Sequence, residues 1–181
     1  SLCHLDAFQR REIISRLSEV SLTYDFLLID TSPGLHDHVL HLNSIADERL
    51  VILTPDPSSF TDAYAQIKVL HQKHRTQNFS VICNQVPDEK QGEQLYLRFA
   101  DVVQQFLPVS LSYKKSIVFD SQMKLANQLQ RLILRQNPKS ISSVAIKSIC
   151  EEIVSQNQMV RSRGEIVNSL DILFSPVSGL A

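Results

Sequence analysis

Short apolar runs and segments of helical periodicity alternate along most of this chain. Three runs rich in leucine, isoleucine, valine and phenylalanine are bounded by polar or turn-forming residues and predict buried parallel strands. These runs lie at 24–29, 50–53 and 79–83. A weaker strand signal at 109–119 is interrupted by Lys114 and Lys115. Elsewhere apolar residues recur every three or four positions, which predicts helices at 6–20, 36–46, 58–70, 88–106, 121–135 and 141–154.

This order of elements predicts a three-layer α/β fold. Helices that alternate with strands cover both faces of a mostly parallel sheet. The helical pattern continues after the last predicted strand, so extra C-terminal helices are expected. We assign residues 1–155 to one domain. The tail at 156–181 is polar at first and then carries an apolar patch at 166–174 that could form an amphipathic helix.

The composition is that of an ordinary globular domain. Of the 181 residues, 43% are hydrophobic and 20% are charged, which is enough apolar material for a sizeable core. The formal net charge of -1 gives no electrostatic reason to expect direct nucleic-acid binding. Three scattered cysteines predict neither a disulfide framework nor a zinc site, and they favour a reducing cytoplasm. The chain begins with Ser1, which is compatible with a fragment of a longer protein.

The most informative chemistry follows the first apolar run, at Asp30-Thr31-Ser32-Pro33-Gly34. A strand that ends in a carboxylate and a glycine-containing loop is typical of phosphate and metal sites at the edge of a parallel sheet. The Asp30 side chain could hold a metal-bound water, and the backbone amide of Gly34 could approach a phosphate closely. A plain exit from strand to loop is the alternative. The phosphate-cradling pattern Gly-x-x-x-x-Gly-Lys-Ser/Thr occurs nowhere in the chain.

The spacing in this loop distinguishes between phosphate-handling families. Gly34 lies four residues after Asp30, whereas the switch of small GTPases has its glycine three residues after the aspartate. The segments 24–35 and 55–70 together resemble the MinD/ParA class of deviant P-loop ATPases, and within it the flagellar-number regulators called FlhG or FleN. The resemblance covers residues 17–153, and its segments fall in the family's order.

The resemblance implies that ATP and Mg²⁺ bind at the carboxyl edge of the sheet. By motif match, Asp30 is the catalytic switch aspartate that organises the metal and the attacking water, and Pro33 and Gly34 lie at the terminal phosphate. Asn84 matches the asparagine that meets the adenine base, with an ordinary loop asparagine as the alternative. The guanine-reading pattern Asn-Lys-x-Asp is absent because Asp88 follows Asn84 by four residues rather than three, which favours adenine.

The sequence departs from the family's pattern in two places. Phe119 and Asp120 match the family's second adenine-side loop, but Val118 stands where the family usually has proline. The family's phosphate loop and its lysine have no counterpart in the chain. Without those groups the remaining residues supply too little electrostatic stabilisation for phosphoryl transfer. We therefore predict that this chain alone has no ATPase activity and binds no cofactor, although the family is one of ATPases.

The resemblance also implies a partner surface. In this family ATP joins two subunits into a sandwich dimer, and a C-terminal amphipathic helix reaches the membrane. Asp56 and Pro57 match the loop that faces the second subunit, and Asp62 lies on the following helix. Helix capping by Ser58 or Ser59 explains part of this loop equally well.

The function that follows is an ATP-dependent molecular switch that regulates the number or placement of flagella. Its expected partners are a second copy of itself, flagellar assembly or regulatory proteins, and a membrane surface contacted by the tail. Its expected location is the cytoplasm, peripheral at the inner membrane. The alternative is a non-catalytic scaffold or interaction protein that keeps the fold and does not hydrolyse nucleotide.

Weaker signals carry other interpretations. His36, Asp37, His38 and His41 are dense enough to suggest zinc, but a solvated helix explains them without a metal. The strip 161–174 combines two arginines with apolar residues, so it could lie on an acidic membrane or pack as an extra helix. The strand-end aspartate is also similar to that of response-regulator receivers. Receivers place their proline one residue later, however, and end a later strand in a Lys-Pro pair that this chain lacks.

Overall fold

The structure is a computed structural model that describes residues 12, 15–17, 19, 20 and 24–162, without the side chains of 38 and 157–162. The chain divides into two compact units, one made of residues 1–47 with 167–181 and the other of residues 48–166. Each unit is described by itself. The second unit contains the sheet and most of the described helices.

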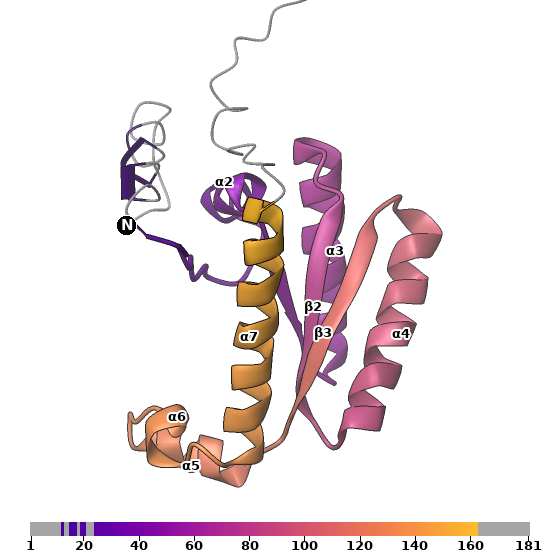
Figure 1. The fold of residues 1–181 in the computed structure, drawn as a ribbon. Coiled ribbons are helices and arrows are strands. Elements are labelled where there is room, and N and C mark those ends of the chain that lie inside the picture. Colours follow the sequence, from indigo (N-terminus) through magenta and orange to yellow (C-terminus); the bar gives the residue numbers. More distant parts are fainter. Residues whose placement is uncertain (1–11, 13–14, 18, 21–23, 163–181) are drawn as a thin grey trace, which may run out of the picture. The chain divides into compact units, whose positions relative to one another are not determined.

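The sheet of the second unit is parallel, as predicted (Figure 1). Its strands are β1 (Leu50–Leu53), β2 (Asn78–Val86) and β3 (Ser110–Val118), in the order β1-β2-β3. The predicted runs at 50–53, 79–83 and 109–119 therefore all form strands. Parallel strands need crossover connections, and α3 (Pro57–His74) and α4 (Glu89–Phe106) provide them. The chain is an α/β protein of the P-loop NTPase-like type.

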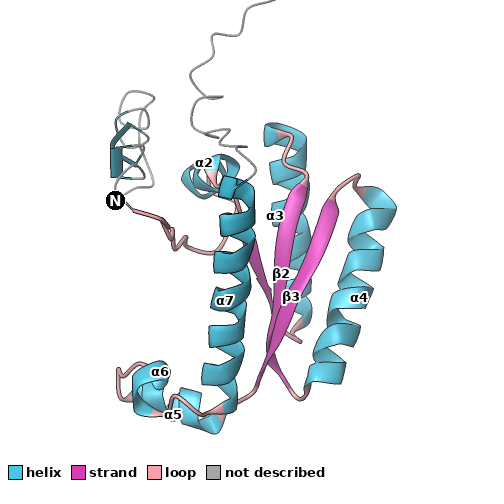
Figure 2. Ribbon diagram, viewed as in Figure 1, coloured by secondary structure: helices cyan, strands magenta, loops and turns pink. Residues whose placement is uncertain are grey.

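Helices cover the sheet from both sides (Figure 2). Helix α3 packs against β1, and α4 packs against β2 and β3. The chain continues after β3 through α5 (Ser121–Gln128) and α6 (Ile133–Gln136) to α7 (Ile141–Ser162), which returns along β3 on the side away from α4. These last three helices confirm that the fold carries additional helices after its sheet.

The core of the second unit lies between the sheet and α3 and α4. Leu53, Val81 and Ile67 are fully buried, and Phe99 of α4 stacks edge-on against Phe60 of α3 with ring centroids 5.0 Å apart. Burial of apolar side chains of this size supplies most of the stabilising free energy of a small domain. The core therefore fixes the strands whose ends carry the candidate site.

A β-bulge in β3 changes which side chains face which helix. Val81 of β2 pairs with Tyr113, but its neighbour Ile82 pairs with Lys115, so Lys114 is the extra residue. Tyr113 lies against Tyr96 of α4, whereas Lys114 and Lys115 both reach α7. An unbroken strand would place neighbouring side chains on opposite faces, and the bulge turns both lysines to one face.

Two predicted elements are wrong. The run at 24–29 is not a strand, and most of its apolar side chains are exposed, Leu28 by 89%. A strand needs a partner for its backbone groups, and no strand of the described residues pairs with this run. The predicted helix 121–135 is broken into α5 and α6, because Gln130 adopts a left-handed φ of 52° and ends the first of them.

Other boundaries agree closely with the predictions. In the first unit α2 (Asp37–Ile45) matches the predicted helix 36–46. Helix α3 begins at Pro57 rather than Ser58, with Asp56 in the N-cap position. Of the predicted helix 6–20 only six residues are described, all of them helical, and the apolar patch at 166–174 lies outside the described residues.

Candidate functional site

The carboxyl ends of the three parallel strands lie at one edge of the sheet, here called the carboxyl edge. The loops that leave this edge are 54–56 after β1, 87–88 after β2 and 119–120 after β3. The backbone N–H of Phe119 donates to the Val86 carbonyl oxygen over 2.8 Å, which ties the ends of β2 and β3 together. Ligands of open parallel sheets bind at such an edge because loops and helix N-termini converge there.

The loop after β1 is organised by its own side chains. The Thr54 hydroxyl donates to the Asp56 carboxylate over 3.0 Å, and the Thr54 backbone N–H donates to the Ser59 hydroxyl oxygen over 3.0 Å. Ser59 therefore holds the loop and does not cap α3, which corrects that part of the capping alternative. Asp56, Pro57 and Asp62 are exposed in this unit, so their predicted role at a dimer interface stays a prediction.

Asn84 lies in a distorted end of β2. Its side-chain oxygen accepts from the backbone N–H of the next residue, Gln85, over 2.9 Å. Gln85 has a left-handed φ of 57°, and the register of β2 against β3 shifts at this point. A non-glycine residue in this conformation stores strain of roughly 1–3 kcal/mol, and such residues cluster at functional sites. No glycine marks this feature, so it could not be predicted from the sequence.

The loop after β3 combines an exposed ring with a firmly held carboxylate. The Phe119 side chain is 57% exposed. The Asp120 carboxylate accepts from the backbone N–H of Gln122 over 2.8 Å and from the hydroxyl of Ser142 over 2.8 Å. Partial burial raises the pKa of Asp120, but the hydrogen bonds from Ser142 and Gln122 outweigh it and hold that pKa below its usual range.

Asp30, Pro33 and Gly34 belong to the first unit. Asp30 is exposed and the chain bends at Pro33 and Gly34 before α2 begins. Gly34 has a φ of 113°, which a residue with a side chain rarely adopts, so the loop requires glycine for its backbone conformation. The roles predicted for these residues at a phosphate and a metal stay predictions.

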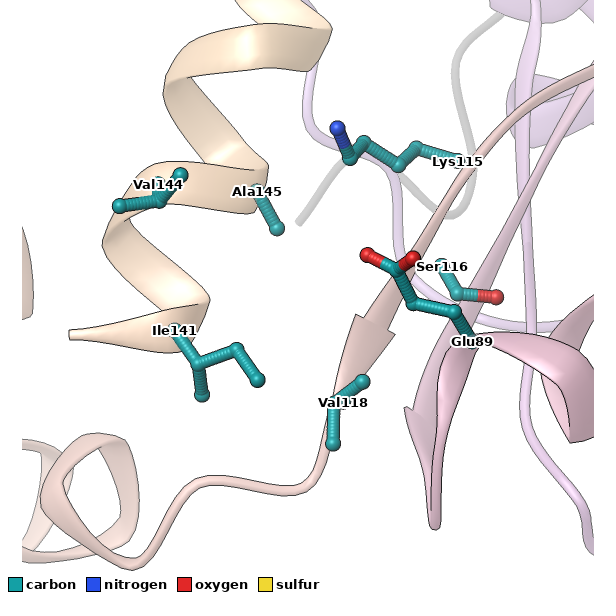
Figure 3. A pocket seen from close by; sticks show the side chains of 7 residues that line it. All are labelled: Glu89, Lys115, Ser116, Val118, Ile141, Val144 and Ala145. Atoms are coloured by element: carbon teal, nitrogen blue, oxygen red, sulfur yellow. The ribbon is translucent and has the colours of Figure 1, made fainter.

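A shallow pocket of about 240 Å³ lies beside the end of β3 (Figure 3). Ile141, Val144 and Ala145 of α7 line one side, and Glu89 of α4 extends from the other. None of the predicted site residues lines this pocket. The pocket lies between the starts of α4 and α7, and we do not assign the predicted chemistry to it.

The described residues contain no group of three or more histidine, cysteine, aspartate or glutamate side chains that could hold a metal ion. Within the same residues, no helix combines the length and the apolar character needed to cross a membrane.

Comparisons with known proteins identify relatives of the chain. No protein-family model matches the chain. The chain is 32% identical over 166 residues to the antiactivator FleN of Pseudomonas aeruginosa, covering 92% of this chain and 59% of that protein. It is 29% identical to the flagellum site-determining protein YlxH of Helicobacter pylori, over 73% of this chain and 45% of YlxH. It is 24% identical to the septum site-determining protein MinD of Bacillus subtilis, over 81% of this chain and 53% of MinD.

These relatives support an assignment of the chain to the MinD/ParA family, in its FlhG/FleN branch. It spans about half the length of the curated relatives that it matches. An alignment of 166 of the 181 residues must include the loop 30–34, Asn84 and the loop 119–120, whichever ends it leaves out. The aligned region therefore contains the predicted site residues.

ATP and Mg²⁺ are the cofactors that the MinD/ParA family implies for the intact protein. The described residues of the carboxyl edge fit the purine end of such a nucleotide. Asn84 offers a carboxamide and Phe119 an exposed ring at the joined ends of β2 and β3.

Sequence reasoning missed Ser142, which holds Asp120. The serines at 140, 142 and 143, before an apolar helical pattern, are nevertheless a recognisable helix-start signal.

Proposed function

We propose that this chain is part of an ATP-dependent switch of the FlhG/FleN type that controls the number or placement of flagella. The observation that carries the proposal is the match to antiactivator FleN over 92% of the chain, which includes every residue of the candidate site. The fold also supports the proposal, because Asn84 and Phe119 lie at the carboxyl ends of two adjacent strands.

In the proposed mechanism the purine lies against Phe119 and is read by Asn84. By motif match, Asp30 would hold Mg²⁺, which would supply charge stabilisation for phosphoryl transfer, and the Gly34 backbone would bind the terminal phosphate. ATP favours a dimer in which Asp56, Pro57 and Asp62 face the second copy. A nucleotide shifts this monomer–dimer equilibrium only as far as its affinities for the two states differ, and hydrolysis resets the equilibrium.

The test uses the complete product of the gene that encodes this chain. Binding of a fluorescent ATP analogue with Mg²⁺ and sedimentation in ATP or ADP measure affinity and dimerisation. We expect ATP-dependent dimers that Asp30→Asn stabilises against hydrolysis, with Asp101→Asn, an exposed carboxylate on α4, as the matched control. No ATP binding by the complete product would contradict the switch.

The biological role is tested by expressing the complete product in Pseudomonas aeruginosa cells that lack FleN. Flagella per cell, counted by electron microscopy, should change with the wild-type protein, and Asp30→Asn, which keeps the protein in its ATP-bound dimer, should alter the size of that change. An effect that Asp30→Asn leaves unaltered would favour the alternative, a scaffold that acts through its fold alone. ATP turnover by purified residues 1–181 would contradict the prediction that this chain alone is inactive.

We also propose that flagellar assembly or regulatory proteins, and a membrane surface reached by the tail at 156–181, are partners of the complete protein. Vesicle flotation with and without the residues after Arg161 tests the membrane contact. Equal flotation of the two forms would contradict it.

A further inference from the structure

The Asp120 carboxylate joins two helices that are separate in sequence. One oxygen accepts from the Gln122 N–H in the first turn of α5, over 2.8 Å. The other oxygen accepts from both the hydroxyl and the backbone N–H of Ser142 in the first turn of α7, over 2.8 and 3.3 Å. A single side chain therefore satisfies backbone donors at the start of two helices, which otherwise have no partner within their own helix.

These contacts leave the carboxylate little capacity for a ligand. A carboxylate offers about four acceptor positions, and Asp120 uses three of them for Gln122 and Ser142. The Ser142 side chain is 0% exposed, so the carboxylate is held from inside the protein. Ser142 presents no polar group at the surface, and Asp120 retains about one acceptor position.

The residue before Asp120 is the one that a base could contact. Phe119 is anchored by its backbone N–H on the Val86 carbonyl oxygen, two residues beyond Asn84, and its ring stays 57% exposed. Loop 119–120 is therefore fixed at one end by β2 and at the other by the first turns of α5 and α7. The direction of the Phe119 ring depends on both anchors.

We propose that Asp120 is a positioning residue, which fixes the Phe119 ring for the purine by tying loop 119–120 to α5 and α7 and does not itself contact the nucleotide. This inference rests on the proposed function for its ligand. It assigns a role to Ser142 as well, because a fully buried hydroxyl can affect nucleotide binding only through Asp120 and the start of α7.

Ser143 provides a matched control for Ser142. Both serines are 0% exposed and lie in the first turn of α7, but the Ser143 hydroxyl donates to the Asn137 carbonyl oxygen and does not bond Asp120. Ser142→Ala and Ser143→Ala therefore remove similar buried hydroxyls from the same turn. Only the first of them removes a direct hydrogen bond to Asp120.

The experiment measures the affinity of the complete gene product for a fluorescent ATP analogue in these two variants and in Asp120→Asn. We expect Ser142→Ala and Asp120→Asn to weaken binding by about three- to tenfold, because a hydrogen bond to a charged group is lost. Ser143→Ala should change affinity by less than about twofold. Equal losses in the two serine variants, or a loss with Asp120→Asn and none with Ser142→Ala, would overturn the positioning role.

A second measurement is independent of nucleotide. Hydrogen exchange of the Phe119 amide, observed by NMR in the nucleotide-free protein, reports whether the loop keeps its bond to Val86. We expect about tenfold faster exchange in Ser142→Ala and Asp120→Asn and little change in Ser143→Ala. If the wild-type protein binds no ATP, the proposed function fails, and unchanged Phe119 exchange in all three variants would overturn the positioning role separately.

Discussion

Helices α4 and α7 cover opposite faces of the same strand, β3, and are held there by different chemistry. The buried face of α4 is apolar or small, with Leu95, Phe99, Val103 and Gly92 against the sheet. Helix α7 also buries Ala145 and Ile149, but it adds a series of polar contacts, here called the polar seam. Its members are the pairs Ser142–Asp120, Ser148–Lys115, Glu152–Lys114 and Gln156–Lys114.

The two packings place different constraints on the helices. Apolar contacts are non-directional, so α4 is stabilised by area and by shape. Hydrogen bonds and ion pairs require particular partners, so the polar seam fixes where along β3 each turn of α7 lies. The bulge at Lys114 makes the seam possible, because it turns two successive lysines toward α7. The losses of stability caused by substitutions on the two helices should therefore differ in size and in their dependence on pH.

The largest expected effect is on the apolar side. Phe99→Ala removes a ring that is 0% exposed and packs against Phe60, and we expect a loss of about 3–5 kcal/mol in the free energy of unfolding. Urea unfolding of the second unit or of the complete protein measures it. Leu97→Ala, on the exposed face of the same helix, should change stability by no more than about 0.5 kcal/mol. A similar loss in both variants would contradict the assigned α4 face.

Lys114→Ala tests the centre of the polar seam. The Lys114 side chain is 3% exposed, and its ammonium lies 3.1 Å from Glu48 and 3.3 Å from Glu152. Its removal leaves two carboxylates without their shared cation, which costs roughly 2–3 kcal/mol after allowance for the partial exposure of both glutamates. Lys114→Met restores volume without charge, so the difference between the two variants in urea unfolding separates packing from electrostatics. Lys124→Ala removes an exposed lysine and is the control. An equal loss of stability in that variant would contradict the role of Lys114 in the polar seam.

Gly92→Ala tests how closely α4 approaches β3. A Cβ at position 92 would collide with the Ser116 side chain, so the gain of about 1 kcal/mol in helix propensity should be outweighed by a loss of roughly 1–3 kcal/mol. Ser116→Gly in the Gly92→Ala background removes the obstructing side chain. We expect it to raise the melting temperature of the single variant. A Gly92→Ala protein as stable as the wild type would show that α4 can shift without cost.

The sequence was sufficient for the elements whose signals are local. The strands at 50–53 and 79–83 were predicted because each apolar run ends at a proline or an asparagine, and both form strands. The run at 24–29 is also mostly apolar and is not a strand, because pairing depends on a neighbour that composition does not reveal. Local patterns could not predict the bulge at Lys114 either, since it depends on the register with β2.

The residues of the candidate site likewise include some that the sequence predicted and one that it did not. Asn84, Phe119 and Asp120 were found from motif matches, and the structure brings their loops to one edge. The partner of Asp120 was not found, because the Ser142 contact joins residues 22 positions apart and no motif encodes it. Positions of side chains are predictable from sequence when a single loop sets them. They are not predictable when two elements must meet first.

The smallest expected effect is on the pH dependence of stability, and it compares the carboxylates that cap α4 and α7. Asp88 caps α4 through Gln91 in its own first turn, whereas Asp120 joins α5 to α7. Hydrogen bonds from Gln91 lower the pKa of the Asp88 carboxyl. Burial raises the pKa of the Asp120 carboxyl, but hydrogen bonds from Ser142 lower that pKa by more. A carboxyl whose pKa is lower in the folded state adds stability above its unfolded pKa, and that contribution is lost as the pH falls through the folded pKa.

Asp120→Asn should therefore destabilise the protein most at pH values above the ordinary pKa of an aspartate, and progressively less as the pH falls through the lowered pKa of the folded Asp120 carboxyl. Urea unfolding at several pH values measures the difference between wild type and variant. Asp88→Asn should show the same sign, with hydrogen exchange raised only in the first turn of α4, while Asp120→Asn raises exchange in both α5 and α7. A wild-type-to-variant difference that stays constant with pH would mean that Asp120 acts without its charge. The polar seam would then owe its specificity at this end to hydrogen-bond geometry alone.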